Sequence, residues 1–109
     1  MKSIDESVIG ELELLLGDDL AGLFDTFRQE SNTQLEQLQQ LLSADDREGL
    51  RRMAHSLKGS ASNLGAASLS GFCANIENEA LEATFSDLTA YLDAVREEHS
   101  QFLKLLDER

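Results

Sequence analysis

Residues 45–65 read DDREGLRRMAHSLKGSASNLG and hold the start, the apolar face and the end of one amphipathic helix. Asp45 followed by Glu48 resembles a capping box, with Asp45 in the cap position. At the other end, Gly65 can adopt the left-handed conformation that closes a helix. A projection at about 100° per residue gives one apolar stripe. This stripe contains Leu50, Met53, Ala54, Leu57, Ser60, Ala61 and Leu64. Only packing against other helices can bury such a stripe.

The chain before this segment carries two further stripes of the same kind. A short helix is predicted over residues 4–16 and ends at Gly17, and a long one runs from about residue 18, with Asp18 as its N-cap, to about residue 42. Ser31 occupies a core-facing position of the long helix. The inward positions are Ile4, Val8, Leu12, Leu15 and Leu16 in the first helix, and Leu20, Leu23, Phe24, Phe27, Leu35, Leu38, Leu41 and Leu42 in the second.

The chain after this segment predicts two more helices. One covers about residues 67–81, and Thr84, with Asp87 three residues later, caps the next. Their inward positions are Leu69, Phe72, Cys73, Ile76 and Ala80, and then Leu88, Leu92, Val95, His99, Phe102 and Leu106. Four amphipathic helices with short connections predict an all-α fold, an antiparallel up-and-down four-helix bundle. We therefore expect one domain over residues 1–109, with a bundle at 18–109 and an N-terminal helix at 1–17 as its cover.

Composition narrows the class of protein. No apolar run is long enough to cross a bilayer, and the first residues lack the pattern of a signal peptide. We therefore expect a soluble, cytoplasmic protein, in which the single cysteine, Cys73, packs in the core. The formal net charge of −12 argues against binding nucleic acid or an anionic membrane surface.

Charge is distributed unevenly along the chain. Residues 47–58 contain four basic residues and one acidic residue, a net charge of +3, whereas the rest contains five basic and twenty acidic residues, a net charge of −15. A positive segment in an acidic chain indicates a binding surface. The alternative is the ordinary mixing of charges on the wet face of a helix, and charge alone leaves both interpretations open.

His55 lies at about 160° from Leu57 on the helical projection, so its side chain is expected to point into solvent. Its neighbours on that face are Arg51, Arg52, Lys58, Gly59 and Ser62. Gly59 costs the helix about 1 kcal/mol relative to alanine, and packing does not explain it on the wet side. Clearance around the imidazole does explain it, because a second protein could then approach the ring.

Imidazole near neutral pH is largely a free base and can act as a nucleophile toward a phosphoryl group. Lys58 would supply a cation beside the phosphoryl oxygens, and the bundle would supply rigidity. An ordinary surface histidine remains the alternative. A metal site is disfavoured because no second His or Cys shares this face, and hydrolysis is disfavoured because no carboxylate on the same helix face orients the ring. His99 lies on an apolar stripe, which indicates a core or boundary residue.

The stretch AHSLKGSASNLGA, residues 54–66, resembles the signature of the histidine-containing phosphotransfer (HPt) family, and the match continues through Leu69, Cys73 and Glu77. The resemblance implies that His55 is the phosphoacceptor, that Lys58 supports the phosphoryl group, and that Gly59 leaves room for the partner. It also suggests that Glu77 lies near the imidazole. Many relatives have glutamine there, so Glu77 either hydrogen-bonds the ring NH or is only a solvated charge.

The same resemblance implies a place in a multistep two-component phosphorelay. The protein would shuttle a phosphoryl group between receiver-domain aspartates, without a nucleotide site and without being a kinase by itself. The partner would be the receiver domain of a response regulator or hybrid sensor kinase, which would hold the Mg²⁺, while this chain binds no cofactor or metal itself. Arg51, Arg52 and Ser62 would belong to the docking face, and a monomer is expected. A helical adaptor that moves no phosphate and an inhibitor that binds receivers are the rival classes.

Overall fold

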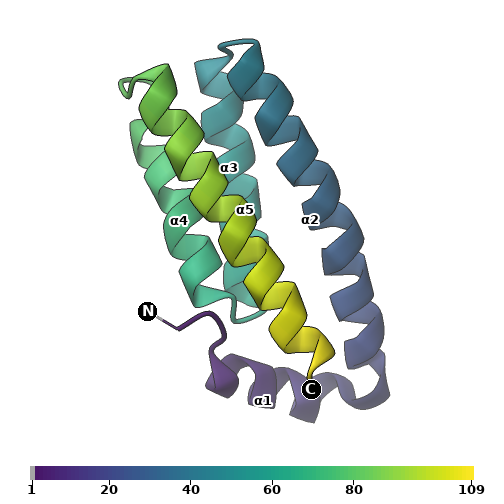
Figure 1. The fold of residues 1–109 in the computed structure, drawn as a ribbon. Helices are drawn as coiled ribbons and strands as arrows, with labels where there is room; N and C mark the ends of the chain where they lie inside the picture. The colour runs from purple at the N-terminus through teal and green to yellow at the C-terminus, as the bar shows by residue number, and fades with distance from the viewer. Residues whose placement is uncertain (1) are drawn as a thin grey trace.

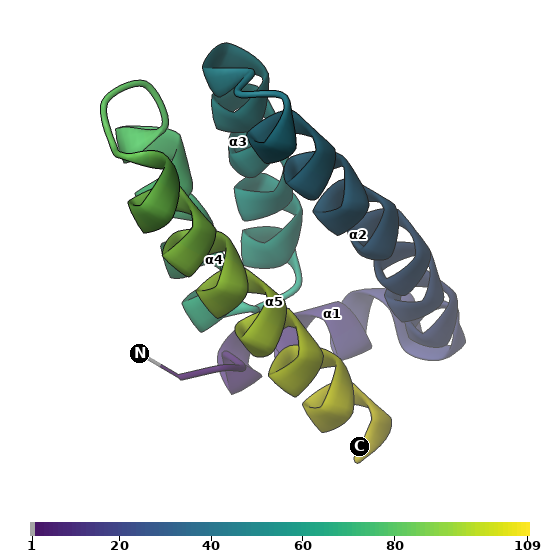
Figure 2. The same cartoon turned by 45° about the horizontal axis from the view of Figure 1, so that its top comes forward.

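The computed structural model describes residues 2–109, and within this range all regular structure is helical (Figure 1). The elements are α1 (Glu6–Leu16), the short 3-10 turn η1 (Gly17–Asp19), α2 (Leu20–Ser43), α3 (Arg47–Asn63), α4 (Ala67–Glu79) and α5 (Phe85–Asp107). Helices α2 to α5 run up and down side by side, and α1 lies across one end of them (Figures 1 and 2). The predicted all-α four-helix bundle with a short N-terminal helix is therefore confirmed.

The core is built from the stripes that face one another in the bundle. Every predicted inward position of α5 is buried, and so are the aliphatic positions Leu50, Leu57 and Leu64 at the α3 stripe. Cys73 is fully buried, as predicted. Two positions of the α3 stripe, Met53 and Ser60, are only partly buried and lie at its border.

The start of α3 differs by one residue from the prediction. Asp46, not Asp45, is the N-cap, and its Oδ1 accepts a hydrogen bond of 2.9 Å from the Gly49 amide. Asp45 instead adopts a left-handed conformation, with φ of 55°. Gly49 makes this cap possible, because a Cβ there would come within 2.6 Å of the Asp46 carboxylate. The cap of α5 is as predicted, since the Thr84 side chain accepts a hydrogen bond from the Asp87 amide.

The junction between α1 and α2 also differs from the prediction. Gly17 ends α1 with φ of 52°, as expected. Asp18 does not cap the next helix, because residues 17–19 form the 3-10 turn η1 and α2 follows without a side-chain cap. Continuous helical turns across this corner leave the Asp18 side chain exposed and without a capping role.

Helix α1 is attached to the turn between α3 and α4. The Asp5 amide donates a hydrogen bond of 2.6 Å to the Gly65 carbonyl, and Gly65 has φ of +76°. A Cβ at Gly65 would lie 2.9 Å from the Asp5 carbonyl oxygen, so this close approach requires glycine. Ile9 is fully buried, although the predicted stripe omitted it, and Leu15 is 80% exposed, although it was predicted to face inward. The predicted face is therefore right at Ile4 and Leu12, which pack against the core, and wrong at Leu15.

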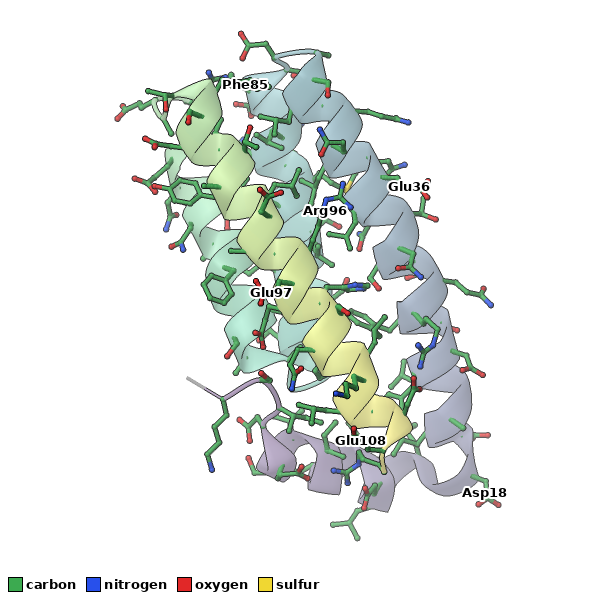
Figure 3. All side chains as sticks on the ribbon, in the orientation of Figure 1. Asp18, Glu36, Phe85, Arg96, Glu97 and Glu108 are labelled. Carbon is green, nitrogen blue, oxygen red and sulfur yellow. The ribbon has the colours of Figure 1, made fainter. Side chains whose placement is uncertain are left out.

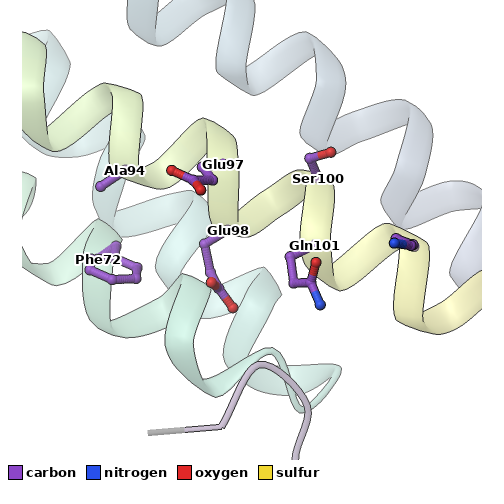
Figure 4. A pocket seen from close by; sticks show the side chains of 7 residues that line it. Phe72, Ala94, Glu97, Glu98, Ser100 and Gln101 are labelled. Carbon is purple, nitrogen blue, oxygen red and sulfur yellow. The ribbon is translucent and has the colours of Figure 1, made fainter.

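Helix α4 has one further difference, at Phe72. This ring was predicted to face inward, but it is 37% exposed and borders a cavity of about 630 Å³ between α4 and α5 (Figure 4). The residues that line the cavity are Phe72, Ala94, Glu97, Glu98, Ser100, Gln101 and Lys104. The acidic side chains of Glu97 and Glu108, labelled in Figure 3, are exposed.

A buried polar pair joins α2 to α5. Ser31 Oγ and His99 Nε2 lie 2.7 Å apart, and both residues are buried, as their places on the stripes predicted. The His99 ring is also tilted against Phe27, at 6.3 Å between centroids. Burial lowers the pKa of His99 from its usual value, and Arg28 and Arg96 lower it further. A neutral imidazole therefore belongs to the folded core.

Candidate functional site

His55 stands on the outer face of α3, at the middle of the helix. Its side chain is 65% exposed, whereas Ala54 and Leu57 on the opposite side of the helix are fully buried. The predicted solvent exposure of this ring is therefore confirmed. The bundle holds the helix on two sides, because α3 packs against both α2 and α4. An imidazole on such a rigid element keeps a fixed direction of approach.

One carboxylate on α4 links the two principal side chains of α3. Glu77 Oε2 lies 2.5 Å from His55 Nδ1, and Glu77 Oε1 lies 2.5 Å from Lys58 Nζ. The Glu77 side chain is only 15% exposed, so it forms the floor between two more exposed groups. Of the two interpretations open for Glu77 from the sequence, the structure shows the hydrogen bond to the ring. The sequence predicted a Lys58 ammonium beside His55 but no partner for it. In the structure this ammonium forms an ion pair with the Glu77 carboxylate.

Glu77 is a hydrogen-bond acceptor at neutral pH. The hydrogen bond from Lys58 lowers the pKa of this carboxyl below its usual value, and the contact with His55 lowers it further, although desolvation acts in the opposite direction. Because an ionised carboxylate can only accept, Nδ1 must carry the ring proton. The lone pair of the neutral ring then lies on Nε2, which has no hydrogen-bond partner among residues 2–109. In the neutral ring, the free lone pair therefore lies on the nitrogen that does not contact Glu77.

The surface around Gly59 is open. It is exposed, and a Cβ built at this position would meet nothing within 4 Å. Packing within the protein therefore does not explain glycine here. A side chain at position 59 would lean toward the preceding turn, over the imidazole of His55.

The rest of the face contains both predicted and unpredicted contacts. Ser62 and Arg52 are exposed, and Arg52 forms no ion pair within the described part of the chain. Arg51 is paired with Glu48, so one predicted docking cation is partly neutralised. This pair could have been predicted from its spacing of three residues on one helix.

Gln34 of α2 donates a hydrogen bond of 3.3 Å to Ser56 Oγ, beside His55. Sequence reasoning missed this contact because nothing in either helix alone indicates which residues meet across their seam.

Other reactive side chains lie apart from this face. Cys73 is buried, and desolvation raises the pKa of its thiol to about 12, so it is neutral at physiological pH. The second histidine, His99, is in the α2–α5 core. Among residues 2–109, no three His, Cys, Asp or Glu side chains gather in a group that could hold a metal ion. Over the same range, no helix combines the length and apolarity needed to cross a bilayer.

Comparisons with known proteins agree with this geometry. The Hpt domain family matches residues 22–104. The chain belongs to the Hpt domain family. Among solved structures, it is similar to the crystal structure of histidine-containing phosphotransfer protein B (HptB) from Pseudomonas aeruginosa PAO1, with a TM-score of 0.92 and 31% sequence identity. That match covers 97% of this chain and 92% of the other. A search of curated proteins gives no match.

Family membership makes the chain a histidine phosphotransfer protein of a phosphorelay. Hpt proteins carry a phosphoryl group, and they interact with receiver domains. The matched range includes all of α3 and α4, and therefore the whole His55–Glu77–Lys58 arrangement.

Proposed function

We propose that Nε2 of His55 accepts a phosphoryl group from the aspartyl phosphate of one receiver domain and passes it to the aspartate of another. The observation that carries this proposal is the hydrogen bond from Nδ1 of the exposed His55 ring to Glu77, because it occupies Nδ1 and makes Nε2 the ring nitrogen that can attack phosphorus. Among residues 2–109, His55 is the one exposed imidazole, since His99 is buried.

The transfer is a displacement at phosphorus. The Nε2 lone pair forms the N–P bond, the P–O bond to the receiver aspartate breaks, and its electron pair remains on that carboxylate. Return transfer reverses these steps. Such reactions depend mainly on position and charge compensation, because the protein contributes little covalent chemistry of its own. The chain would act as a carrier and not as a kinase.

Lys58 and Gly59 support the transfer in different ways. The Lys58 ammonium and the His55 imidazole contact the two oxygens of the same Glu77 carboxylate. Because the Lys58 side chain is 33% exposed, a short movement would bring its ammonium to the phosphoryl oxygens. The open surface at Gly59 would admit the partner.

The partner would be the receiver domain of a response regulator or of a hybrid sensor kinase. Its acidic active site, which would bring the Mg²⁺, would meet the positive segment of α3, with Arg51, Arg52 and Ser62 at the contact. The interface would be small and short-lived, as a carrier requires. We further propose that the protein acts as a monomer, since most apolar stripe residues of α2 to α5 are buried inside the bundle. We also propose that it acts in the cytoplasm, as a place in a phosphorelay implies.

The decisive variant is His55→Gln. The variant should take no label from a receiver phosphorylated with radioactive phosphate, because the nucleophile is gone. Its helical circular dichroism and melting temperature should stay close to those of the wild type, because the side chain is exposed. The label on the wild-type protein should be lost in acid and stable in alkali, as expected of a phosphoramidate.

Labelling of the His55→Gln variant at the wild-type rate would disprove the assignment. Binding of a phosphorylated receiver without any transfer to the wild-type chain would instead support the adaptor class. A Ser100→Ala variant is a suitable control, because Ser100 is exposed on α5, outside the proposed docking face, and contributes no nucleophile to the proposed step.

A further inference from the structure

The acidic side chain at position 77 has a chemical consequence for the phosphorylated state. Once Nε2 bonds to phosphorus, the ring carries a positive charge as long as Nδ1 keeps its proton. If that proton is lost, return transfer must expel an imidazolide anion, which is a poor leaving group. If it is kept, return transfer expels neutral imidazole, and the N–P electron pair returns to Nε2. The protonation of Nδ1 therefore sets how readily the phosphoryl group leaves.

We propose that the Glu77 carboxylate keeps the proton on Nδ1 of His55 while Nε2 carries the phosphoryl group, so that return transfer remains fast at neutral and mildly alkaline pH. Glu77 is thus a positioning residue that acts through the imidazole. This inference rests on the proposed function of His55. It adds a reason for a carboxylate at position 77, because a neutral amide would orient the ring without compensating its charge.

The geometry supports a charged interaction at this contact. The distance of 2.5 Å between Nδ1 and Oε2 is short, as hydrogen bonds that involve an ionised group are. The carboxylate is largely shielded from solvent, which strengthens its attraction to a cationic ring. The contact therefore favours the protonated phosphorylated ring over the neutral one.

In the unphosphorylated protein, Lys58 weakens the attraction between the Glu77 carboxylate and the His55 ring. It holds the other oxygen of Glu77 at 2.5 Å, so one carboxylate is shared by two donors. The phosphoryl group would offer the ammonium a second anion, and movement of Lys58 toward it would leave more of the carboxylate charge to His55.

The remaining surroundings of the ring are neutral on α2 and α4 and basic on α3. The neutral Gln34 of α2 contacts Ser56 beside the ring, and the thiol of Cys73 on α4 is neutral. On α3 itself, Arg51 is paired with Glu48. Arg52 is exposed on the same helix.

The test measures the Nδ1 proton directly. The wild type, Glu77→Gln and Lys58→Met would be phosphorylated with phosphoramidate, which needs no receiver, and the His55 ring nitrogens followed by ¹⁵N NMR against pH. The pKa of the phosphorylated ring should fall in Glu77→Gln by on the order of one unit, a tenfold loss of proton affinity. It should rise in Lys58→Met, because a cation near the phosphorylated ring has been removed. Circular dichroism would check that both variants are folded.

The kinetic consequence provides a second readout. As the pH rises, the rate of transfer from phosphorylated Glu77→Gln to a receiver should decline at a lower pH than the rate for the wild type. The difference in pH should equal the difference in the pKa of the phosphorylated ring. Equal ring pKa values and superimposable pH profiles for the wild type and Glu77→Gln would overturn this inference and leave the proposed function intact. A wild-type chain that takes no phosphoryl group on His55 would overturn both.

Discussion

At the scale of the residue, the candidate site joins features that the sequence predicts with a contact that it does not. The exposure of His55 follows from its position on the helical projection, and so does the proximity of Gly59 and Lys58. The shared carboxylate of Glu77 could not be predicted from one helix, because it depends on how α4 is rotated against α3. The resemblance to the family suggested that Glu77 lies nearby, but only the structure shows which atoms meet.

Gly59 allows a matched pair of variants. Gly59→Ala should raise the free energy of unfolding by about 1 kcal/mol through helix propensity, with transfer largely retained, because the added methyl group meets no neighbour. Gly59→Glu should fold equally well but block transfer, because a long acidic side chain would cover the ring and repel the phosphoryl group. Urea unfolding and receiver-dependent labelling measure the two effects. Normal transfer by Gly59→Glu would contradict the steric role of this position.

At the scale of the element, sequence patterns located the helices better than their exact ends. All the predicted helices are present, and the buried stripe of α5 is the predicted one. The cap of α3 was misplaced because two adjacent aspartates can each cap a helix, and periodicity does not say which one takes the left-handed conformation. The predicted face of α1 was wrong at Leu15 and omitted Ile9, because a short helix at the end of a bundle is positioned by single contacts, such as that between Asp5 and Gly65.

The corrected cap can be tested at position 46. Asp46→Ala should lower the free energy of unfolding by about 1 kcal/mol, because the Gly49 amide loses its side-chain acceptor. Asp46→Asn should be close to the wild type, since asparagine is an equally good cap. Urea unfolding of the three proteins measures the difference. Equal stability of Asp46→Ala and Asp46→Asn would show that the side chain does not cap α3.

At the scale of the whole molecule, the fold separates two histidines by their surroundings. His55 lies in an exposed, ionic setting on α3, whereas His99 lies in the core between α2 and α5 and hydrogen-bonds Ser31. The sequence predicted this difference from the apolar stripes, but not the buried partner of His99. The same fold pairs three basic side chains of residues 47–58 with carboxylates, namely Arg47 with Asp45, Arg51 with Glu48 and Lys58 with Glu77, and leaves Arg52 without an ion pair in the described part of the chain.

The buried histidine predicts how global stability depends on pH. Because burial lowers the pKa of His99 in the folded state, the unfolded chain binds the proton more readily. The free energy of unfolding should therefore fall as the pH drops below about 6.5, the usual value for histidine, and level off below the pKa of the folded state. Urea unfolding of the wild type and His99→Gln at several pH values isolates this contribution. A stability difference between them that does not change with pH would contradict it.

The central claim is that Nε2 of His55 carries the phosphoryl group. The most direct measurement is NMR of the protein labelled with ¹⁵N in histidine, after transfer from a phosphorylated receiver. A one-bond coupling between ³¹P and ¹⁵N should appear at Nε2 of His55, with the His99 signals unchanged. A phosphorus coupling at Nδ1, at His99, or at no ring nitrogen of a labelled protein would contradict the account.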